Sequence, residues 1–272
     1  MSKTRFRYDF RLCIHICALS IGLSTSIGAW AAANSCSAQS PPNITTVIEL
    51  YTSEGCSSCP PADQWLSGLK TVLDPKTPNL VVQAFHVGYW NYIGWVDRFA
   101  DPAHTQRQRQ IATWNRQNTI YTPQLTYNSK DWRDWRVYTG ASLLNQVAKS
   151  ASQELASSRI SLQQLSKDQF VATVAPVVGV AGKANAWSAY WTVTEHGHAS
   201  KVSAGENTGE HLLHDFVVRQ YTPVGTYSAG ATHKLSFFSK PATPGHARQI
   251  NLVLFDPSTG STVQALSVNC GA

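Results

Sequence analysis

The most constraining feature of this 272-residue chain is the segment VIELYTSEGCSSCPPAD, residues 47–63. Its apolar, β-branched start is typical of a buried strand, and apolar residues at helical spacing follow over residues 62–73. Cys56 and Cys59 lie between the two, directly before a pair of prolines that fits best in the first turn of a helix. The segment therefore predicts a strand, a CxxC loop and a helix in direct succession.

Residues 1–33 have the three parts of a secretory signal peptide. A basic start precedes a mostly apolar stretch over residues 12–27, and small residues at 29–33 are typical of a cleavage site. The apolar stretch is short compared with the roughly 20 residues of a membrane span, and an uncleaved anchor is the alternative. We expect a cleaved signal peptide, a periplasmic or secreted mature protein, and a flexible Ser/Pro/Asn-rich lead-in over residues 34–43.

The charge of the chain argues against nucleic acid as a partner. The formal net charge of +6 falls to +3 without residues 1–33, because four basic residues and one acidic residue lie there. No block of lysines and arginines remains in the mature sequence. We therefore predict no nucleic-acid binding and no stable membrane insertion after cleavage.

Cleavage would leave four cysteines, namely Cys36, Cys56, Cys59 and Cys270. An even number in an exported chain usually means disulfides, and four cysteines allow three pairings. The economical pairing joins the local pair Cys56 and Cys59, and it leaves Cys36 to bond with Cys270 across the two ends of the mature chain. Closing so long a loop would stabilise the fold by about 4 kcal/mol on chain entropy alone.

The pattern of apolar residues changes character near residue 158. Residues 44–158 alternate strand and helix patterns, with a second buried strand over residues 80–87, and this predicts an α/β domain that contains a βαβ unit. Residues 159–272 consist mainly of short runs of alternating apolar and polar residues between turns. That spacing predicts an all-β antiparallel sandwich-like domain after the first domain.

A CxxC loop between a strand and a helix suits thiol–disulfide exchange. Backbone N–H groups and the dipole at the start of the helix favour a thiolate over a thiol. We expect Cys56 to be the exposed nucleophile and Cys59 the resolving cysteine, with hydroxyl donors from Ser57 and Ser58. A purely structural disulfide and half of a zinc site are the alternatives.

A zinc site would need two further ligands, and no second CxxC or HxxxH motif follows the first. His86, His211 and His214 are possible ligands, but nothing in the sequence places them near the loop. A Gly-rich connection in the second half holds Glu206, Asn207, His211, His214 and Asp215. The preferred interpretation of this connection is a polar hairpin or a domain-interface loop. We therefore predict no metal and no cofactor.

Pro123 interrupts the apolar run of residues 119–128, and a proline within a strand normally marks an edge, a bulge or a cis peptide bond. The order of strand, CxxC, helix, strand and Thr122-Pro123 resembles the thioredoxin fold. The segments VIELYTSEGCSSCPPAD, AFHVGYWNYIGWVDRFADPAHTQRQR, IYTPQLTYN and GENTGEHLLHDFVVRQYTPVG resemble an exported bacterial thioredoxin-like family known as domain of unknown function 1223. The resemblance covers nearly the whole mature chain.

This resemblance implies roles for particular residues. Cys56 and Cys59 take the redox positions, Pro123 lies against their disulfide, and the backbone of Thr122 pairs with an extended substrate segment. Glu49 takes the place of a buried acid that helps to deprotonate the resolving cysteine, and a solvent-facing strand residue is the alternative. The chain lacks the usual tryptophan before the first cysteine and has Ser-Ser between the cysteines, so the resemblance does not carry over a redox potential.

An aromatic segment follows the second buried strand. His86 ends this strand, and Tyr89 and Trp90 come shortly after it, where α/β proteins place ligand contacts. One interpretation is a substrate groove beside the cysteines, in which His86 tunes thiol ionisation. The other is a satisfied histidine under an aromatic lid that covers the core.

These observations favour an exported thiol–disulfide oxidoreductase that acts on protein or peptide disulfides and works with a redox partner protein. Cys56 attacks or is attacked, a mixed disulfide forms, and Cys59 releases it. Two alternatives stay open. One is a peptide- or carbohydrate-binding module with a structural CxxC disulfide, and the other is delivery of copper or zinc through the cysteines.

Overall fold

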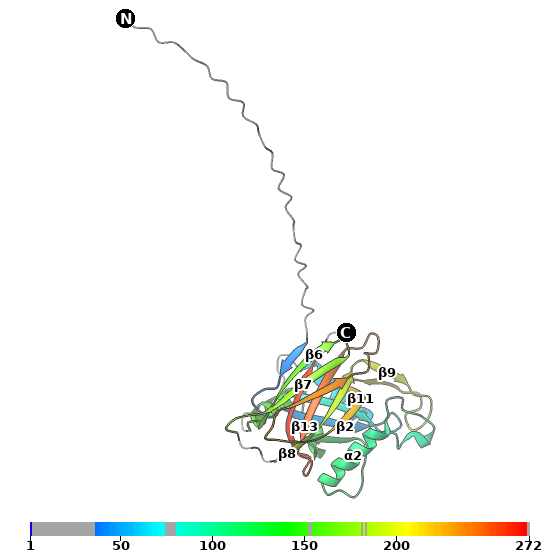
Figure 1. Ribbon diagram of the computed structural model, residues 1–272. Coiled ribbons are helices and arrows are strands. Elements are labelled where there is room, and N and C mark those ends of the chain that lie inside the picture. The colour runs from blue at the N-terminus through cyan, green and yellow to red at the C-terminus, as the bar shows by residue number, and fades with distance from the viewer. Residues whose placement is uncertain (2–35, 74–79, 152–153, 181, 183, 271–272) are drawn as a thin grey trace. The chain divides into compact units, whose positions relative to one another are not determined.

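The computed structural model describes residue 1 and residues 36–73, 80–151, 154–180, 182 and 184–270 (Figure 1). Residues 34–272 form one compact unit. Apart from residue 1, the predicted signal peptide lies outside the described residues, and so does the start of the predicted lead-in. Within the described part of the chain, no helix is both long enough and apolar enough to cross a membrane.

The first half of this unit is built around two parallel strands. β2 (Thr46–Thr52) and β3 (Leu80–His86) run parallel, and β4 (Gln124–Tyr127) pairs with the other side of β2 in the antiparallel orientation. β5 (Lys130–Asp131) follows β4 at the sheet edge. Every residue of β2 and β3 is buried, which explains why both strands have continuous apolar runs rather than alternating ones.

Short helices fill the connections between these strands. α1 (Pro60–Gly68) begins directly after Cys59 and continues as the 3-10 helix η1 (Leu69–Thr71). α2 (Pro102–Trp114) is capped by Asp101, whose carboxylate accepts a hydrogen bond from the backbone N–H of Ala103. The first half also contains the helices η2 (Asn91–Ile93), η3 (Arg133–Val137) and α3 (Gly140–Ala151).

The second half of the unit is almost entirely β. Together with β1 (Ser37–Gln39), its strands are β6 (Ser158–Ser166), β7 (Gln169–Pro176), β8 (Ala186–Glu195), β9 (His198–Lys201), β10 (His211–His214), β11 (Val217–Ser228), β12 (His233–Phe238), β13 (Arg248–Phe255) and β14 (Thr262–Val268). One antiparallel sheet has the order β1-β6-β7-β12, and β9 and β10 form an antiparallel hairpin.

One eight-stranded sheet joins the two halves of the chain. Its order is β14-β13-β8-β11-β3-β2-β4-β5, and the start of β11 runs parallel to β3 through the pair Val217 and Ala84. The start of β11 covers the edge of β3, whose backbone groups would otherwise be unpaired. The N–H of Ala84 donates to the carbonyl of Phe216 at this edge.

The shared sheet corrects the expected fold class. An α/β thioredoxin-like domain followed by a separate all-β sandwich-like domain was expected, and this expectation is wrong. The chain is mostly β, with one large mixed sheet, further antiparallel sheets and few helices among the described residues. Local patterns correctly indicate strands and helices, but they do not show that the strands of the second half pair with β3.

Buried side chains form three clusters, and one of them connects the two halves. The first lies between the four-stranded sheet and β8 and β13, and the second packs α1 and α3 against one face of β2 and β3. On the opposite face, Tyr51 and Phe85 meet Tyr190 of β8 and Val253 of β13. The boundary predicted at residue 158 coincides with the start of β6, and this third cluster extends across it.

A buried ion pair lies within the third cluster. The carboxylate of Glu49 on β2 accepts hydrogen bonds from Arg107 of α2 at 3.0 Å and from the hydroxyls of Tyr190 at 2.6 Å and Tyr51 at 3.1 Å. The guanidinium carbon of Arg107 lies 4.6 Å from the ring centroid of Tyr190, and both charged side chains are only 1% exposed. The ion pair therefore connects α2, β2 and β8.

A disulfide between Cys36 and Cys270 ties the two ends of the compact unit together, and this is the pairing expected from the sequence. Cys36 precedes β1, and Cys270 follows β14. Hydrogen bonds support the same junction, because the side chain of Gln264 on β14 accepts from the N–H of Thr45 and donates to the carbonyl of Pro41.

We predict that Arg107→Met lowers the free energy of unfolding by about 3–5 kcal/mol, because it leaves the Glu49 carboxylate buried without a cation. Urea unfolding followed by circular dichroism measures the change. Arg109→Met on the exposed side of the same helix is the matched control and should change stability by less than about 0.5 kcal/mol. An equally small effect of Arg107→Met would contradict the importance of the pair.

We also predict that the double variant Cys36→Ser/Cys270→Ser is less stable than the wild type by up to about 5 kcal/mol. The disulfide closes a loop with a sequence separation of 234, and its loss returns conformational entropy to the unfolded chain. Denaturant unfolding with and without reductant checks this. In reductant neither protein retains a disulfide, so the wild type and the double variant should have similar free energies of unfolding.

Candidate functional site

Three strand termini meet at one edge of the eight-stranded sheet. Thr52, the last residue of β2, lies opposite His86, the last residue of β3. On the other side of β2, the first residue of β4, Gln124, pairs with Tyr51, and this brings Pro123 into register with Thr52. The peptide bond that precedes Pro123 is cis. The CxxC loop leaves β2 at this edge, and loops at the carboxyl ends of parallel strands commonly bind ligands.

The two cysteines of the loop form a disulfide at the start of α1. Cys59 is the N-cap residue of this helix, and Pro60 and Pro61 follow in the first turn, where a missing N–H group costs no intrahelical hydrogen bond. The hydroxyl oxygen of Ser58 lies 3.3 Å from Sγ of Cys56. On reduction, this hydroxyl and the helix dipole would both stabilise a thiolate.

Both cysteines are buried in the folded chain. Cys56 is 1% exposed and Cys59 is fully buried, whereas Ser57 and Ser58 between them are exposed. The expectation that Cys56 is an exposed nucleophile is therefore wrong. Part of its cover comes from the second half of the chain, which no local sequence pattern places near the CxxC loop.

This cover is the connection between β9 and β10, residues 202–210, which we name the covering loop. The side-chain amide of Asn207 donates hydrogen bonds to the carbonyl of Glu54 at 2.9 Å and to the carbonyl of Cys56 at 3.0 Å. Asn207 is itself buried. One side chain of the covering loop therefore satisfies two backbone acceptors of the CxxC loop.

Two further contacts hold the covering loop in place. The carboxylate of Glu206 accepts a hydrogen bond from the backbone N–H of Ser57 at 2.9 Å, and this bond lowers the pKa of the exposed Glu206. Gly205 has a φ of 77° and approaches Ile93 so closely that a Cβ would come within 3.1 Å of its Cδ1. Glycine therefore suits this position on both counts.

A buried polar cluster lies beside the CxxC loop and consists of Glu54, Asp63, His86, Asp97 and His214. None of the five residues is more than 7% exposed. Nε2 of His214 donates to Oε1 of Glu54 at 3.2 Å, and Nδ1 of His86 donates to Oδ2 of Asp97 at 2.7 Å. The two imidazole rings lie 4.9 Å apart between centroids, and Nδ1 of His214 is 3.7 Å from Oδ1 of Asp63.

Burial and charge act in opposite directions on the pKa values of this cluster. Burial alone would lower the pKa of His214, but the hydrogen bonds and charges of Asp63 and Glu54 outweigh it and raise that pKa to about 10. Burial alone would raise the pKa values of Glu54 and Asp97, but their hydrogen bonds and, for Asp97, the charge of His86 leave both pKa values lowered. The carboxylates of Glu54 and Asp97 are therefore held in their ionised form, with His214 and His86 as their imidazole partners.

The predicted aromatic residues connect the CxxC loop with the cis-proline segment. A Cβ on Gly55 would come within 3.1 Å of Cβ of Trp90, so the two are in close contact. Nε1 of Trp90 donates to Oγ1 of Thr122 at 2.7 Å. Tyr89 is half-buried next to Trp90, whereas His86 is fully buried and does not line a surface groove.

Glu49 lies away from the cysteines. It projects from the face of β2 opposite α1, where its partner is Arg107. It is fully buried, so it is not a solvent-facing strand residue either. The acid one helical turn after Cys59 is instead Asp63, whose Oδ2 accepts a hydrogen bond from the hydroxyl of Thr52 at 2.7 Å.

The structure brings together side chains that the sequence analysis kept apart. His86 and His214 lie side by side, whereas His211 is exposed on β10. Sequence reasoning missed Glu54, Asp63 and Asp97 as members of this group. The one local signal for Asp63 is its position four residues after Cys59, on the same side of the first helical turn.

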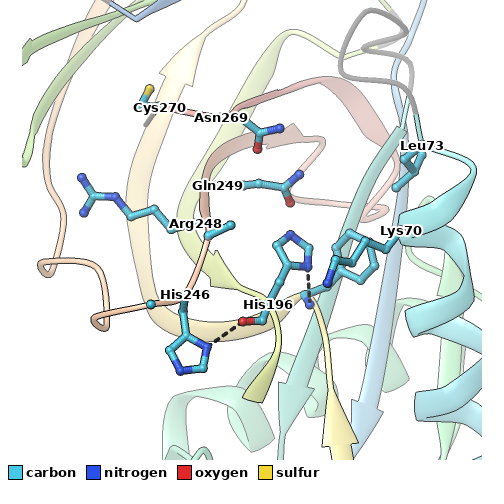
Figure 2. A pocket seen from close by; sticks show the side chains of 11 residues that line it. Lys70, Leu73, His196, His246, Arg248, Gln249, Asn269 and Cys270 are labelled. Carbon is cyan, nitrogen blue, oxygen red and sulfur yellow. Dashed lines mark hydrogen bonds between the residues drawn. The ribbon is translucent and has the colours of Figure 1, made fainter. Parts of the chain in front are cut away.

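A separate pocket of about 560 Å³ opens between η1 and the start of β13 (Figure 2). Lys70, His196 and Arg248 are among its lining residues, and no residue of the CxxC loop contributes to it. Lys70 pairs with Asp215 at 2.9 Å, and Arg248 pairs with Asp168 at 2.9 Å. Because both cations already have carboxylate partners, this pocket is a weaker candidate for an anionic ligand than its lysine and arginine suggest.

Residues 47–255 match a family model described as "Protein of unknown function (DUF1223)". The match includes the CxxC loop, the cis-proline segment and the covering loop. The chain belongs to this family. No curated protein matches this DUF1223 chain.

Two solved structures resemble this DUF1223 protein in fold. A crystal structure of a protein from Agrobacterium tumefaciens is 20% identical, with a TM-score of 0.59 over 84% of this chain and 96% of that chain. HBP35 of Porphyromonas gingivalis is 14% identical, with a TM-score of 0.56 over 84% of this chain and 76% of that chain. Similarity at these identities shows a shared fold alone.

We predict that Asn207→Ala increases the rate at which a mild reductant opens the Cys56–Cys59 disulfide by roughly tenfold. The substitution removes two hydrogen bonds, each contributing about 0.5–1.5 kcal/mol to holding the covering loop closed. Timed alkylation and mass spectrometry of residues 56 and 59 measure the rate. Glu210→Ala, an exposed substitution in the same loop, is the control, and equal rates for the two variants would show that Asn207 does not limit access.

Proposed function

We propose that the mature protein is an exported thiol–disulfide oxidoreductase whose working pair is Cys56 and Cys59. The observation that carries the proposal is the position of their disulfide at the start of α1, at the edge where β2 and β3 end. Trp90 links the same loop to the cis Thr122–Pro123 segment. A disulfide that served only as a cross-link would not need a helix start that stabilises a thiolate.

In the oxidising direction, a substrate thiolate attacks Sγ of Cys56. A bond forms between the substrate sulfur and Cys56, the bond to Cys59 breaks, and Cys59 leaves as a thiolate. A second substrate thiolate then attacks the substrate sulfur of this mixed disulfide, and Cys56 leaves as a thiolate. The substrate has lost two electrons and the cysteine pair has gained them. A redox partner protein restores the pair, and the reverse sequence reduces a substrate disulfide.

Exchange requires Cys56 to become accessible, and the covering loop, which is hydrogen-bonded to the backbone of this buried residue, is the segment that we propose moves. The hydrogen bonds between the two loops come from Asn207 and Glu206, so separating the two loops there breaks a small number of hydrogen bonds. The exposed Ser57 and Ser58 and the backbone of Thr122 then supply polar contacts to an extended peptide. Protein or peptide thiols are accordingly the proposed substrates.

Export is part of this proposal. Two disulfides are bonded in the structure, and disulfides persist in oxidising compartments. The basic, apolar and small-residue pattern of residues 1–33 supports a signal peptide. The two observations together support the proposed periplasmic or secreted location.

Burial of both sulfurs favours a second candidate function, a peptide- or carbohydrate-binding module with a structural CxxC disulfide. The two functions differ in how the disulfide reacts. A working pair has a reduction potential close to that of its compartment, whereas a structural disulfide resists reduction by mild thiols. The measured reduction potential of the Cys56–Cys59 bond therefore separates them.

The oxidoreductase proposal predicts that Cys59→Ser accumulates a mixed disulfide through Cys56 when it is mixed with a disulfide-containing peptide, because no resolving thiol releases it. Non-reducing electrophoresis and mass spectrometry detect the adduct, and Cys56→Ser should form far less of it. Arg109→Met, which should leave stability nearly unchanged, is the control and should retain peptide turnover. Unchanged turnover by Cys56→Ser would disprove the proposal.

A further inference from the structure

Three buried side chains that the exchange chemistry does not use bring one potential ligand atom each close together. Asp63 lies on α1, His86 ends β3 and His214 ends β10. One carboxylate oxygen and one nitrogen of each imidazole all lie within 4.8 Å of one another. We propose that Asp63, His86 and His214 bind a divalent transition-metal ion such as Zn²⁺ through two imidazole nitrogens and one carboxylate oxygen.

The first support is that the two histidines are short of partners inside the cluster. Nε2 of His86 is buried and has no hydrogen bond, and Nδ1 of His214 is buried with its ion-pair partner, Oδ1 of Asp63, 3.7 Å away and beyond hydrogen-bond distance. Buried polar atoms are rarely left in this state. In each ring the other nitrogen donates to a carboxylate, so a metal that displaces the remaining ring proton would find the lone pair that it needs on the second nitrogen.

The second support is the outer layer of hydrogen bonds around the three ligands. His86 donates its other ring proton to Asp97, and His214 donates its other ring proton to Glu54. A histidine that binds a metal typically makes this bond to a carboxylate, which fixes the ring and increases its basicity. The second oxygen of Asp63 accepts a hydrogen bond from the hydroxyl of Thr52 at 2.7 Å, which orients the remaining ligand.

The third support is charge. Glu54, Asp63 and Asp97 bring three carboxylates into one buried volume. Across the described residues, the ion pairs of these carboxylates are with His86 and His214, and none is with a lysine or an arginine. Buried charges normally require a partner or a metal, and a divalent cation would replace the positive charge that the imidazoles lose with their protons on metal binding.

The ligand types also indicate the class of metal. Imidazole nitrogens suit Zn²⁺ and its first-row neighbours, whereas Mg²⁺ and Ca²⁺ prefer oxygen ligands alone. Bonds of about 2.0–2.1 Å hold tetrahedral ligand atoms roughly 3.4 Å apart, so the three side chains would move slightly inward around the ion. Three protein ligands leave a fourth position for water or another ligand.

The test uses the mature protein with its disulfides intact, so that no thiol competes for the metal. After removal of metal with a chelator, isothermal titration with Zn²⁺ should show one equivalent bound, and titration with Mg²⁺ should show none. His86→Gln, His214→Gln and Asp63→Asn should each abolish the Zn²⁺ signal. His233→Gln, on the far strand β12, should leave it unchanged.

A spectrum of the Co²⁺-loaded wild type gives a readout that does not depend on the folding of any variant. Ligand-field bands without a thiolate charge-transfer band are expected from nitrogen and oxygen ligands. Asp97→Asn should weaken Zn²⁺ affinity by roughly 10–100-fold, because it removes the carboxylate that orients His86.

Three results would overturn the metal site: no Zn²⁺ binding by the wild type, binding that survives in the ligand variants, or a thiolate band in the Co²⁺ spectrum. The double variant Cys56→Ser/Cys59→Ser should still bind one Zn²⁺. This outcome separates the metal site from the oxidoreductase proposal, because Zn²⁺ binding at this site does not require the two cysteines.

Discussion

The carboxylate of Glu49 and the guanidinium of Arg107 form a buried ion pair, and residues from both halves of the chain surround it. Tyr51 lies on β2, whereas Tyr190 lies on β8, and both hydroxyls donate to the same carboxylate. A buried charge without its partner costs several kcal/mol, so this arrangement is stable only when β8 is docked against β2 and β3. The docking of the two halves is therefore a condition of the native state.

The functional geometry depends on the same docking. Once β8 and β11 have joined the sheet beside β3, the β9–β10 hairpin between them places the covering loop against the CxxC loop and His214 beside His86. Glu54 contributes to both arrangements, because its backbone accepts from Asn207 and its side chain accepts from His214. The redox loop and the proposed metal site are thus neighbours held by one hairpin, although their chemistry is separate.

Local sequence reasoning succeeded where the decisive forces are local. The apolar runs that begin at Thr46 and Leu80 are strands, a helix begins after Cys59, and the proline at residue 123 marks a cis bond at a strand start. It was wrong about the fold class and about the exposure of Cys56. Both errors have the same origin, because pairing between β3 and β11 and cover from Asn207 depend on residues more than a hundred positions away.

By itself, the sequence determined the positions of the first two buried strands and of the helix after Cys59, the location of the CxxC motif and the economical pairing of four cysteines. Hydrophobic periodicity, proline geometry and cysteine spacing act over a few residues and are visible in the sequence. Only the tertiary structure decided that Glu49 turns toward Arg107, that Cys56 is covered, and that Asp63 meets two histidines from distant strands. These outcomes depend on which sheet faces pack together. Packing decides which side chain lies beside each carboxylate and imidazole, and that neighbour becomes its partner.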